Sequence, residues 1–148
     1  MTTFLKNRDM KFSFHLLLAC IALTACGESG KMTADYRIVP CPGEIAPGDG
    51  GDFELDARTR IICTGDNDGM RANAEFLAGY VESVIGSAPE ITGPDGLCDD
   101  GRAVILRADA PGKGGEAYEI EVSENRITVS GESDAGVFYG IQTLRKAM

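Results

Sequence analysis

Two stretches of the chain carry apolar residues with the period of an α-helix. Because residues three and four apart share one helix face, each stretch predicts an amphipathic helix. The first should begin at an N-cap, Asn67 or Asp68, and end at Gly86, and the second should begin at Ser133 or Asp134. The apolar positions are Met70, Ala74, Leu77, Val81, Val84 and Ile85 in the first helix, and Val137, Ile141, Leu144 and Met148 in the second.

Between these helices, "EAYEIEVSENRITVSG" alternates apolar and polar residues, which predicts a β-hairpin. With Glu124-Asn125 as a two-residue loop, all apolar side chains fall on one face. Asn125 is expected to adopt the positive φ that such loops favour. The facing pairs are Val122 with Ile127, Ile120 with Val129, and Tyr118 with Gly131.

Four further segments indicate strands. "YRIVPCP" is confined to an edge or a strand end by its prolines, "DFELDARTRIICT" predicts a strand pair or one bent strand, and "PEITG" predicts a short strand. The unbroken apolar run of "RAVILRAD" indicates a strand buried on both faces. We therefore expect an α+β fold, a two-layer sandwich with a mixed, largely antiparallel sheet and two helices on one side.

The first 26 residues have the layout of a bacterial export signal. Lys11 is followed by an apolar stretch that is shorter than the roughly 20 residues of a membrane-spanning helix. The run Leu23-Thr24-Ala25-Cys26 resembles the lipobox of bacterial lipoproteins, which implies cleavage before Cys26 and a lipid on that cysteine. An ordinary signal peptide is the alternative, and Met10 is an alternative start.

The sequence thus predicts a signal at residues 1–25, a flexible tether at 26–35 and one domain at 36–148. The expected location is the cell envelope, on the periplasmic or cell-surface side, with the membrane reached through the lipid on Cys26. The formal net charge of −9 opposes binding to nucleic acid, because phosphate contacts require Lys and Arg. We expect no nucleic-acid partner.

After removal of the signal, three cysteines remain, Cys41, Cys63 and Cys98. Three cysteines in an oxidising compartment permit one disulfide and one free thiol, and the sequence does not select the pair. They lack C-x-x-C spacing, and the only histidine, His15, lies in the signal. We therefore expect no metal site, no cofactor and no catalysis by a Ser-His-Asp or Cys-His set.

Other polar clusters have simpler structural explanations. Asp99-Asp100 indicates a turn, and Asp66–Gly69 indicates a helix N-cap rather than a calcium loop, which needs a Glu where Leu77 stands. Glu119 and Glu121 should form the solvent side of the hairpin. The Gly136-x-x-x-Gly140 spacing favours close packing of the last helix on the sheet. No catalytic or substrate-binding residue emerges from the sequence.

Two segments carry a family resemblance. "GVFYGIQTL" at 136–144, after the hairpin, resembles the end of the N-terminal domain of family-20 glycoside hydrolases, the β-N-acetylhexosaminidases, and "RIVPCPGEI" resembles its beginning. The resemblance covers residues 36–148. It implies a small α/β domain packed against a catalytic (β/α)8 barrel, and hydrolysis of terminal N-acetyl-β-hexosamine residues in which the substrate's acetamido oxygen is the nucleophile.

The catalytic parts of that family are missing from this sequence. It contains no Asp-Glu dipeptide, which in the family orients the acetamido group and protonates the leaving oxygen, and no Trp to line a sugar pocket. The final helix also lacks a Gly or Asn cap after Lys146. We therefore expect it to lead into a barrel that is not on this chain. The alternatives are a stand-alone lipoprotein module that binds glycan or protein, and an accessory domain of another glycosidase family acting on N-acetylated sugars.

Overall fold

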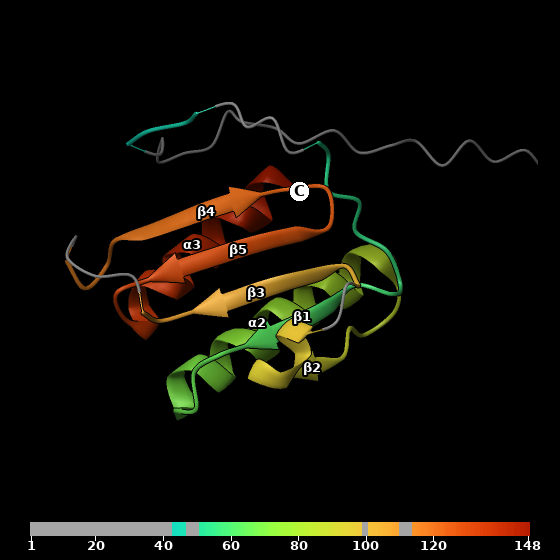
Figure 1. Ribbon diagram of the computed structural model, residues 1–148, viewed down its shortest axis with the longest axis horizontal. Coiled ribbons are helices and arrows are strands. Elements are labelled where there is room, and N and C mark those ends of the chain that lie inside the picture. Colours follow the sequence, from blue (N-terminus) through green and yellow to red (C-terminus); the bar gives the residue numbers. More distant parts are fainter. Residues whose placement is uncertain (1–42, 47–50, 99–100, 110–113) are drawn as a thin grey trace, which may run out of the picture. The chain divides into compact units, whose positions relative to one another are not determined.

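The computed structural model describes residues 43–46, 51–98, 101–109 and 114–148, and the following account is confined to these. They form five strands, two α-helices and one short 3₁₀ helix (Figure 1). In chain order the elements are β1 (Arg60–Cys63), α2 (Asp68–Ile85), β2 (Ile91–Thr92), η1 (Pro94–Cys98), β3 (Ala103–Arg107), β4 (Tyr118–Val122), β5 (Arg126–Gly131) and α3 (Asp134–Ala147).

The strands form one mixed sheet in the order β2-β1-β3-β5-β4. The pairs β1–β2, β1–β3 and β3–β5 are parallel, and only β4–β5 is antiparallel. The predicted two-layer α+β fold with a mixed sheet is confirmed. The prediction that most strand pairs are antiparallel is wrong for the described strands. The chain crosses over through α2 between β1 and β2, so β2 runs in the same direction as β1.

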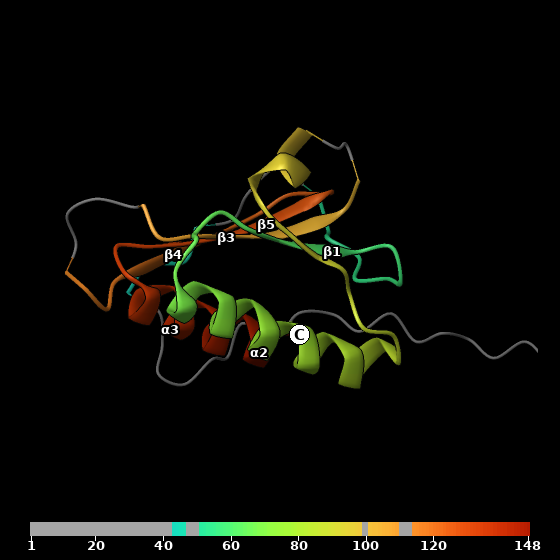
Figure 2. The same ribbon diagram turned by 90° about the horizontal axis from the view of Figure 1, so that it is seen from below.

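Both helices cover the same face of the sheet, and η1 lies on the other face (Figure 2). The alternation of side chains along each strand directs one set of residues toward the helices, and these form the main core. A small second cluster, Ile62, Ala103 and Ile105, lies on the face of η1. The main core comprises Ile61, Cys63, Met70, Ala74, Leu77, Val81, Val104, Leu106, Ile127, Val129, Val137, Ile141 and Leu144.

Helix α2 begins and ends as its sequence predicts. The Asn67 side chain accepts a hydrogen bond from the Met70 backbone N–H, and Gly86, at a φ of 74°, closes the helix with a bond to the Glu82 carbonyl. One predicted core position is wrong: Val84 is 40% exposed. In the same last turn of the helix, Ile85 packs against the main core and Val84 does not.

The hairpin has the predicted register, with Val122 opposite Ile127 and Tyr118 opposite Gly131. The Ser123 backbone N–H donates to the Arg126 carbonyl across the two-residue loop. The expected positive φ at Asn125 is wrong, since none of the described non-glycine residues has a positive φ. The Asn125 carbonyl instead accepts a hydrogen bond from the Ala103 N–H of β3, which fixes the loop from outside the hairpin.

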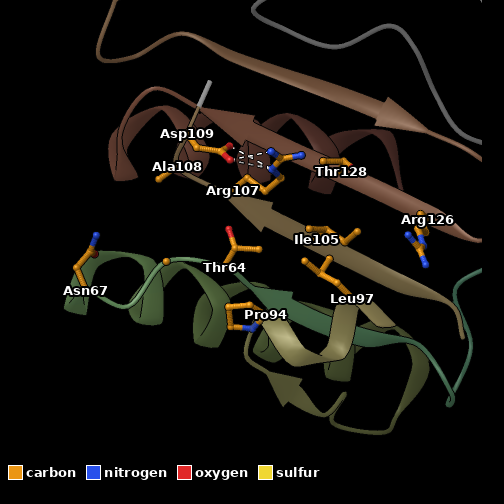
Figure 3. Close-up of a pocket in the computed structure, with 11 residues that line it drawn as sticks. Thr64, Asn67, Pro94, Leu97, Ile105, Arg107, Ala108, Asp109, Arg126 and Thr128 are labelled. Atoms are coloured by element: carbon orange, nitrogen blue, oxygen red, sulfur yellow. Dashed lines mark hydrogen bonds and ion pairs between the residues drawn. The ribbon is translucent and has the colours of Figure 1, made fainter. Parts of the chain in front are cut away.

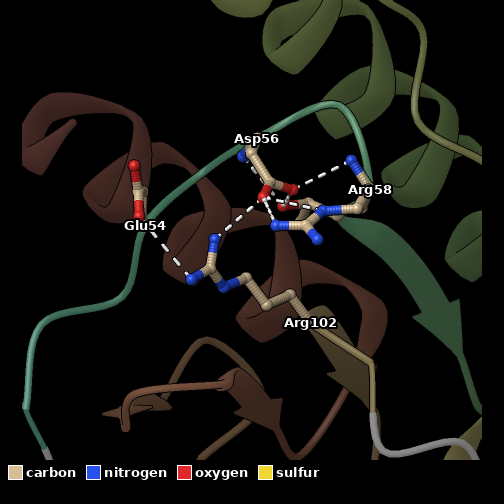
Figure 4. A network of polar contacts seen from close by, with 5 residues as sticks. Glu54, Asp56, Arg58 and Arg102 are labelled. Carbon is tan, nitrogen blue, oxygen red and sulfur yellow. Dashed lines mark hydrogen bonds and ion pairs between the residues drawn. The ribbon is translucent and has the colours of Figure 1, made fainter.

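Only the second half of the segment 52–64 is a strand. Phe53 and Leu55 pack against the main core as partly buried residues without belonging to a strand. A cluster of ion pairs holds the non-strand half in place: Arg102 lies 2.8 Å from Asp56 and 3.6 Å from Glu54 (Figure 4). The short strand at "PEITG" and the buried strand at "RAVILRAD" are confirmed as β2 and β3.

Helix α3 approaches the sheet through its two glycines, as predicted. A Cβ atom added at Gly140 would lie 2.5 Å from Cγ1 of Val129, and one added at Gly136 would overlap the carbonyl oxygen of Ala117. Ser133 is the N-cap and accepts a hydrogen bond from the Gly136 N–H.

Several predictions fall outside the described residues. These are the signal and tether with Cys26, the strand predicted at 36–42, Cys41 and the Asp99-Asp100 turn. No helix within the described residues is long and apolar enough to cross a membrane.

Candidate functional site

The solvent side of the two helices carries a cluster of aromatic residues, Phe76 and Tyr80 from α2 and Phe138 and Tyr139 from α3. Together with Arg145 we call this cluster the helical patch. Phe76, Phe138 and Tyr139 are 38%, 36% and 43% exposed. The Phe76 and Phe138 rings touch across the helix pair at a centroid distance of 5.5 Å, and Phe138 meets Tyr139 edge-on at 6.0 Å.

Arg145 lies between two rings of this patch. Its guanidinium carbon is 4.8 Å from the Phe76 ring centroid and 4.6 Å from that of Tyr80. Nη1 donates to Oε1 of Gln142 at 3.0 Å, whereas Nε is buried and has no hydrogen-bond partner. The Tyr80 hydroxyl donates to the Arg145 carbonyl at 3.0 Å. The arginine is therefore held mainly by ring faces, an arrangement worth about 0.5–2 kcal/mol depending on solvent exposure.

Polar contacts at the other end of the helices keep this patch preformed. The Asn67 side-chain nitrogen donates to Oδ1 of Asp134 at 3.2 Å. Asn73, buried in the α2–α3 interface, donates to the Asp134 carbonyl at 2.8 Å. Asn67 and Asp134 join the N-terminal ends of the two helices, and Tyr80 and Arg145 join their C-terminal parts. The two helices therefore run parallel and are tied at both ends.

Exposed aromatic residues around an arginine are typical of a protein-binding surface. Aromatic and arginine side chains are enriched in the buried centres of protein interfaces and at the residues that dominate binding energy. The patch needs no ordering of long flexible chains, because Arg145 is already fixed between rings. We identify the helical patch as the candidate functional site, a docking surface.

A second candidate is a groove of about 640 Å³ on the opposite face of the sheet, beside η1 (Figure 3). Its polar groups are engaged in local structure: Asn67 caps α2, and Arg107 forms an ion pair of 2.7 Å with Asp109. Among the described residues that line it, Asp109 is the only carboxylate, so these residues supply no pair of acids for glycosidic chemistry. Its lining comprises Thr64, Gly65, Asn67, Pro94, Leu97, Ile105, Arg107, Ala108, Asp109, Arg126 and Thr128.

The other sequence candidates have the structural roles expected of them. Glu119 and Glu121 are exposed on β4, and the Asp66–Gly69 cluster forms the N-terminus of α2. Cys63 has a free thiol, buried and in contact with the carbonyl oxygens of Gly65 and Met70 at 3.5 and 3.6 Å. The side chains of Cys41 and Cys98 lie outside the described part of the structure, so the disulfide stays a prediction. Over the described ranges, no three acidic, Cys or His side chains gather to hold a metal ion.

Sequence reasoning missed the helical patch. It identified the apolar stripe of the last helix but assigned no role to the aromatic residues beside it. In the structure Val137 and Ile141 of that stripe are fully buried, whereas Met148 at its end is partly buried. The exposed aromatic residues Phe138 and Tyr139 lie next to that stripe in the sequence. A large aromatic residue one step off the apolar stripe, such as Phe76 beside Leu77 or Phe138 beside Val137, was the available signal.

The described residues thus form a small mixed sheet with two helices on one face, and those helices carry the helical patch. The family model described as glycosyl hydrolase family 20, domain 2, matches residues 35–148. The chain therefore belongs to this family and carries the accessory domain of β-hexosaminidase-type enzymes.

Two kinds of relative agree with this assignment. The β-hexosaminidase of Porphyromonas gingivalis is 26% identical over an alignment of 152 positions, which covers 90% of this chain and 18% of that protein. The β-N-acetylhexosaminidase of Streptomyces coelicolor is 25% identical with a TM-score of 0.65, over 76% of this chain and 21% of that one. The Streptomyces plicatus enzyme has the same identity and coverage, with a TM-score of 0.60. The chain thus spans about a fifth of the length of these relatives.

Proposed function

We propose that this chain is the N-terminal, non-catalytic domain of a lipid-anchored β-N-acetylhexosaminidase, and that its helical patch packs against the catalytic (β/α)8 barrel of that enzyme. The complete enzyme would hydrolyse terminal non-reducing N-acetyl-β-hexosamine residues with assistance from the substrate's acetamido group. All groups that act on the sugar would come from the barrel. This domain would stabilise and position the barrel.

The helical patch is the observation that carries the proposal. An exposed cluster of three aromatic side chains and an arginine on a preformed helix pair suits a large, permanent neighbour. The relatives are about five times longer than the matched part of this chain, which leaves ample length for a barrel of roughly 250 residues. The groove on the other face offers no comparable apolar surface.

The size of the native protein tests this function. An immunoblot of the source cells with antibodies against residues 36–148 should give a band several times larger than the 15.7 kDa of this chain. A band near 15.7 kDa would overturn the proposal and favour a free module that binds glycan or protein.

Lipid attachment at Cys26 is a separate part of the proposal, and it places the protein at the cell envelope. Cells fed an alkyne-tagged fatty acid should label the wild-type protein and the control variant Cys20→Ser, but not Cys26→Ser. The Cys26→Ser variant should also leave the membrane fraction. Equal labelling of all three proteins, or labelling of none, would contradict the anchor.

A further inference from the structure

Arg145 differs in its partners from four other arginines of the described residues. In a chain with 23 acidic and 14 basic residues, an arginine has many carboxylates to choose from. Arg58, Arg71, Arg102 and Arg107 each have a carboxylate oxygen within 2.7–3.2 Å. Within the described ranges Arg145 has none, and the side-chain acceptor of its guanidinium there is the neutral amide of Gln142.

The surroundings of Arg145 make this missing partner significant. Ring faces of Phe76 and Tyr80 displace water from the guanidinium and fix its plane. Its Nε is already buried without an acceptor. A desolvated guanidinium that is short of acceptors gains more from a carboxylate than a solvated one does, because a charge-assisted hydrogen bond strengthens where water is excluded.

We infer that Arg145 is the charged anchor of the helical patch, and that it pairs with a carboxylate on the surface of the catalytic domain. This inference rests on the proposed function. Phe76, Phe138 and Tyr139 would surround the pair and exclude water once the two domains meet. The planar, forked guanidinium also sets the direction of approach, so the pair would fix the register of docking as well as its strength.

Linker proteolysis in the full-length enzyme is the first test. In Arg145→Gln, the rate of cleavage between the domains should rise about tenfold or more, because truncating one partner of a buried charge pair leaves the other charge unpaired. The matched control is Arg71→Gln, which removes an exposed arginine of α2 that pairs with Asp68 within its own helix. That control should leave the rate unchanged. Circular dichroism should show that both variants keep their secondary structure.

A cross-linking test separates pairing from a merely structural role. Arg145→Lys places an amine between the same rings, and a water-soluble carbodiimide joins an amine to a carboxylate only where the two touch. We expect a new cross-linked peptide that connects the end of α3 with an Asp or Glu of the catalytic domain. Wild-type enzyme measures the background from the neighbouring Lys146. Reversing both charges of the identified pair should restore slow cleavage.

The outcomes distinguish this inference from the proposed function. A large native protein in which Arg145→Gln behaves as wild type, or in which no cross-link to the catalytic domain is specific to Arg145→Lys, would overturn the inference alone. A native protein no larger than this chain would overturn both. A specific cross-link between two copies of this domain would also overturn the inference, because the occupant of the patch would then be a second copy.

Discussion

At the scale of single residues, the contact between α3 and the sheet depends on the missing side chain of Gly136. The Cα of this residue faces the backbone of Ala117 and Gly131, neither of which can rotate away as a side chain could. In contrast, Gly79 on α2 is exposed, and a Cβ added there would meet nothing within 4 Å.

These two glycines give a matched pair of substitutions. Gly136→Ala should lower the free energy of unfolding by about 1–3 kcal/mol, because overpacking outweighs the better helix propensity of alanine. Gly79→Ala should raise it by about 0.5–1 kcal/mol, since only propensity changes. Urea unfolding followed by circular dichroism measures both. A loss of stability in both variants would show that the tight contact at Gly136 is not the cause.

Asp56 is the centre of the ion-pair cluster in Figure 4. Burial acts to raise the pKa of its carboxyl, but hydrogen bonds from Arg58 and the charges of Arg58 and Arg102 outweigh burial and hold the pKa below the ordinary value of 3.8. A carboxyl whose pKa is lower in the folded state than in the unfolded state stabilises the fold above the unfolded value. That stabilisation is lost as pH falls through the folded value.

Asp56→Asn should therefore reduce stability by about 1 kcal/mol at neutral pH, where charge-assisted bonds are lost from a partly exposed site. The difference from wild type should shrink as the pH is lowered below 3.8, the ordinary value for this carboxyl. Urea titrations between neutral and strongly acidic pH measure it. Glu54→Gln is the control, because Glu54 is largely exposed and lies 3.6 Å from Arg102. An unchanging difference across the pH range would contradict this role of Asp56.

At the scale of elements, the sequence predicts those parts whose partners lie nearby in the chain. The hairpin register follows from alternation on both sides of a two-residue loop, and the ends of α2 follow from Asn67 and Gly86. The direction of strand pairing could not be predicted, because β1 finds its partners in β2 and β3, which lie beyond a long helix. Phe53 and Leu55 alternate like a strand, yet they pack on the core without a strand partner.

The N-terminus of α2 offers a prediction at this scale. Asn67 both caps α2 and contacts Asp134 of α3, so Asn67→Ala should lower the free energy of unfolding by about 1–2 kcal/mol, toward the upper end of the range for a cap. Asp66→Ala is the control, since Asp66 precedes the cap and is exposed. Chemical denaturation of the two variants measures the difference. Equal stabilities would exclude a special role of the cap.

At the scale of the whole described domain, the two faces of the sheet differ in packing and in the side chains they expose. The helical face holds nearly all of the core and carries the helical patch, whereas the other face holds the small cluster and the polar groove. The sequence shows that Phe76 and Phe138 lie beside the apolar stripes, but periodicity identifies only which residues face the sheet. It does not show which off-stripe aromatics of two helices meet across the pair.

Two leucines test whether the helical face contributes more to the core than the face beside η1. Leu77 lies fully buried between α2 and the sheet, and Leu97 is 37% exposed on η1. Leu77→Ala should lower the free energy of unfolding by about 2–5 kcal/mol, whereas Leu97→Ala should cost less than about 1 kcal/mol. Thermal unfolding compares the two, and it would also detect a Leu77→Ala variant that fails to fold. A similar loss from both would mean that the face beside η1 is as important to the core as the helical face.

The parallel pairing of β3 with β5, and the tie between α2 and α3, also determine when the helical patch exists. Phe76 is made before Phe138, and the two rings can meet only when α3 lies beside α2. Contacts between distant parts of the chain form slowly and require the later part to be present. A nascent chain that has not yet produced α3 therefore has no complete patch to offer. Under the proposed function, docking to the catalytic domain therefore has to follow the folding of this domain.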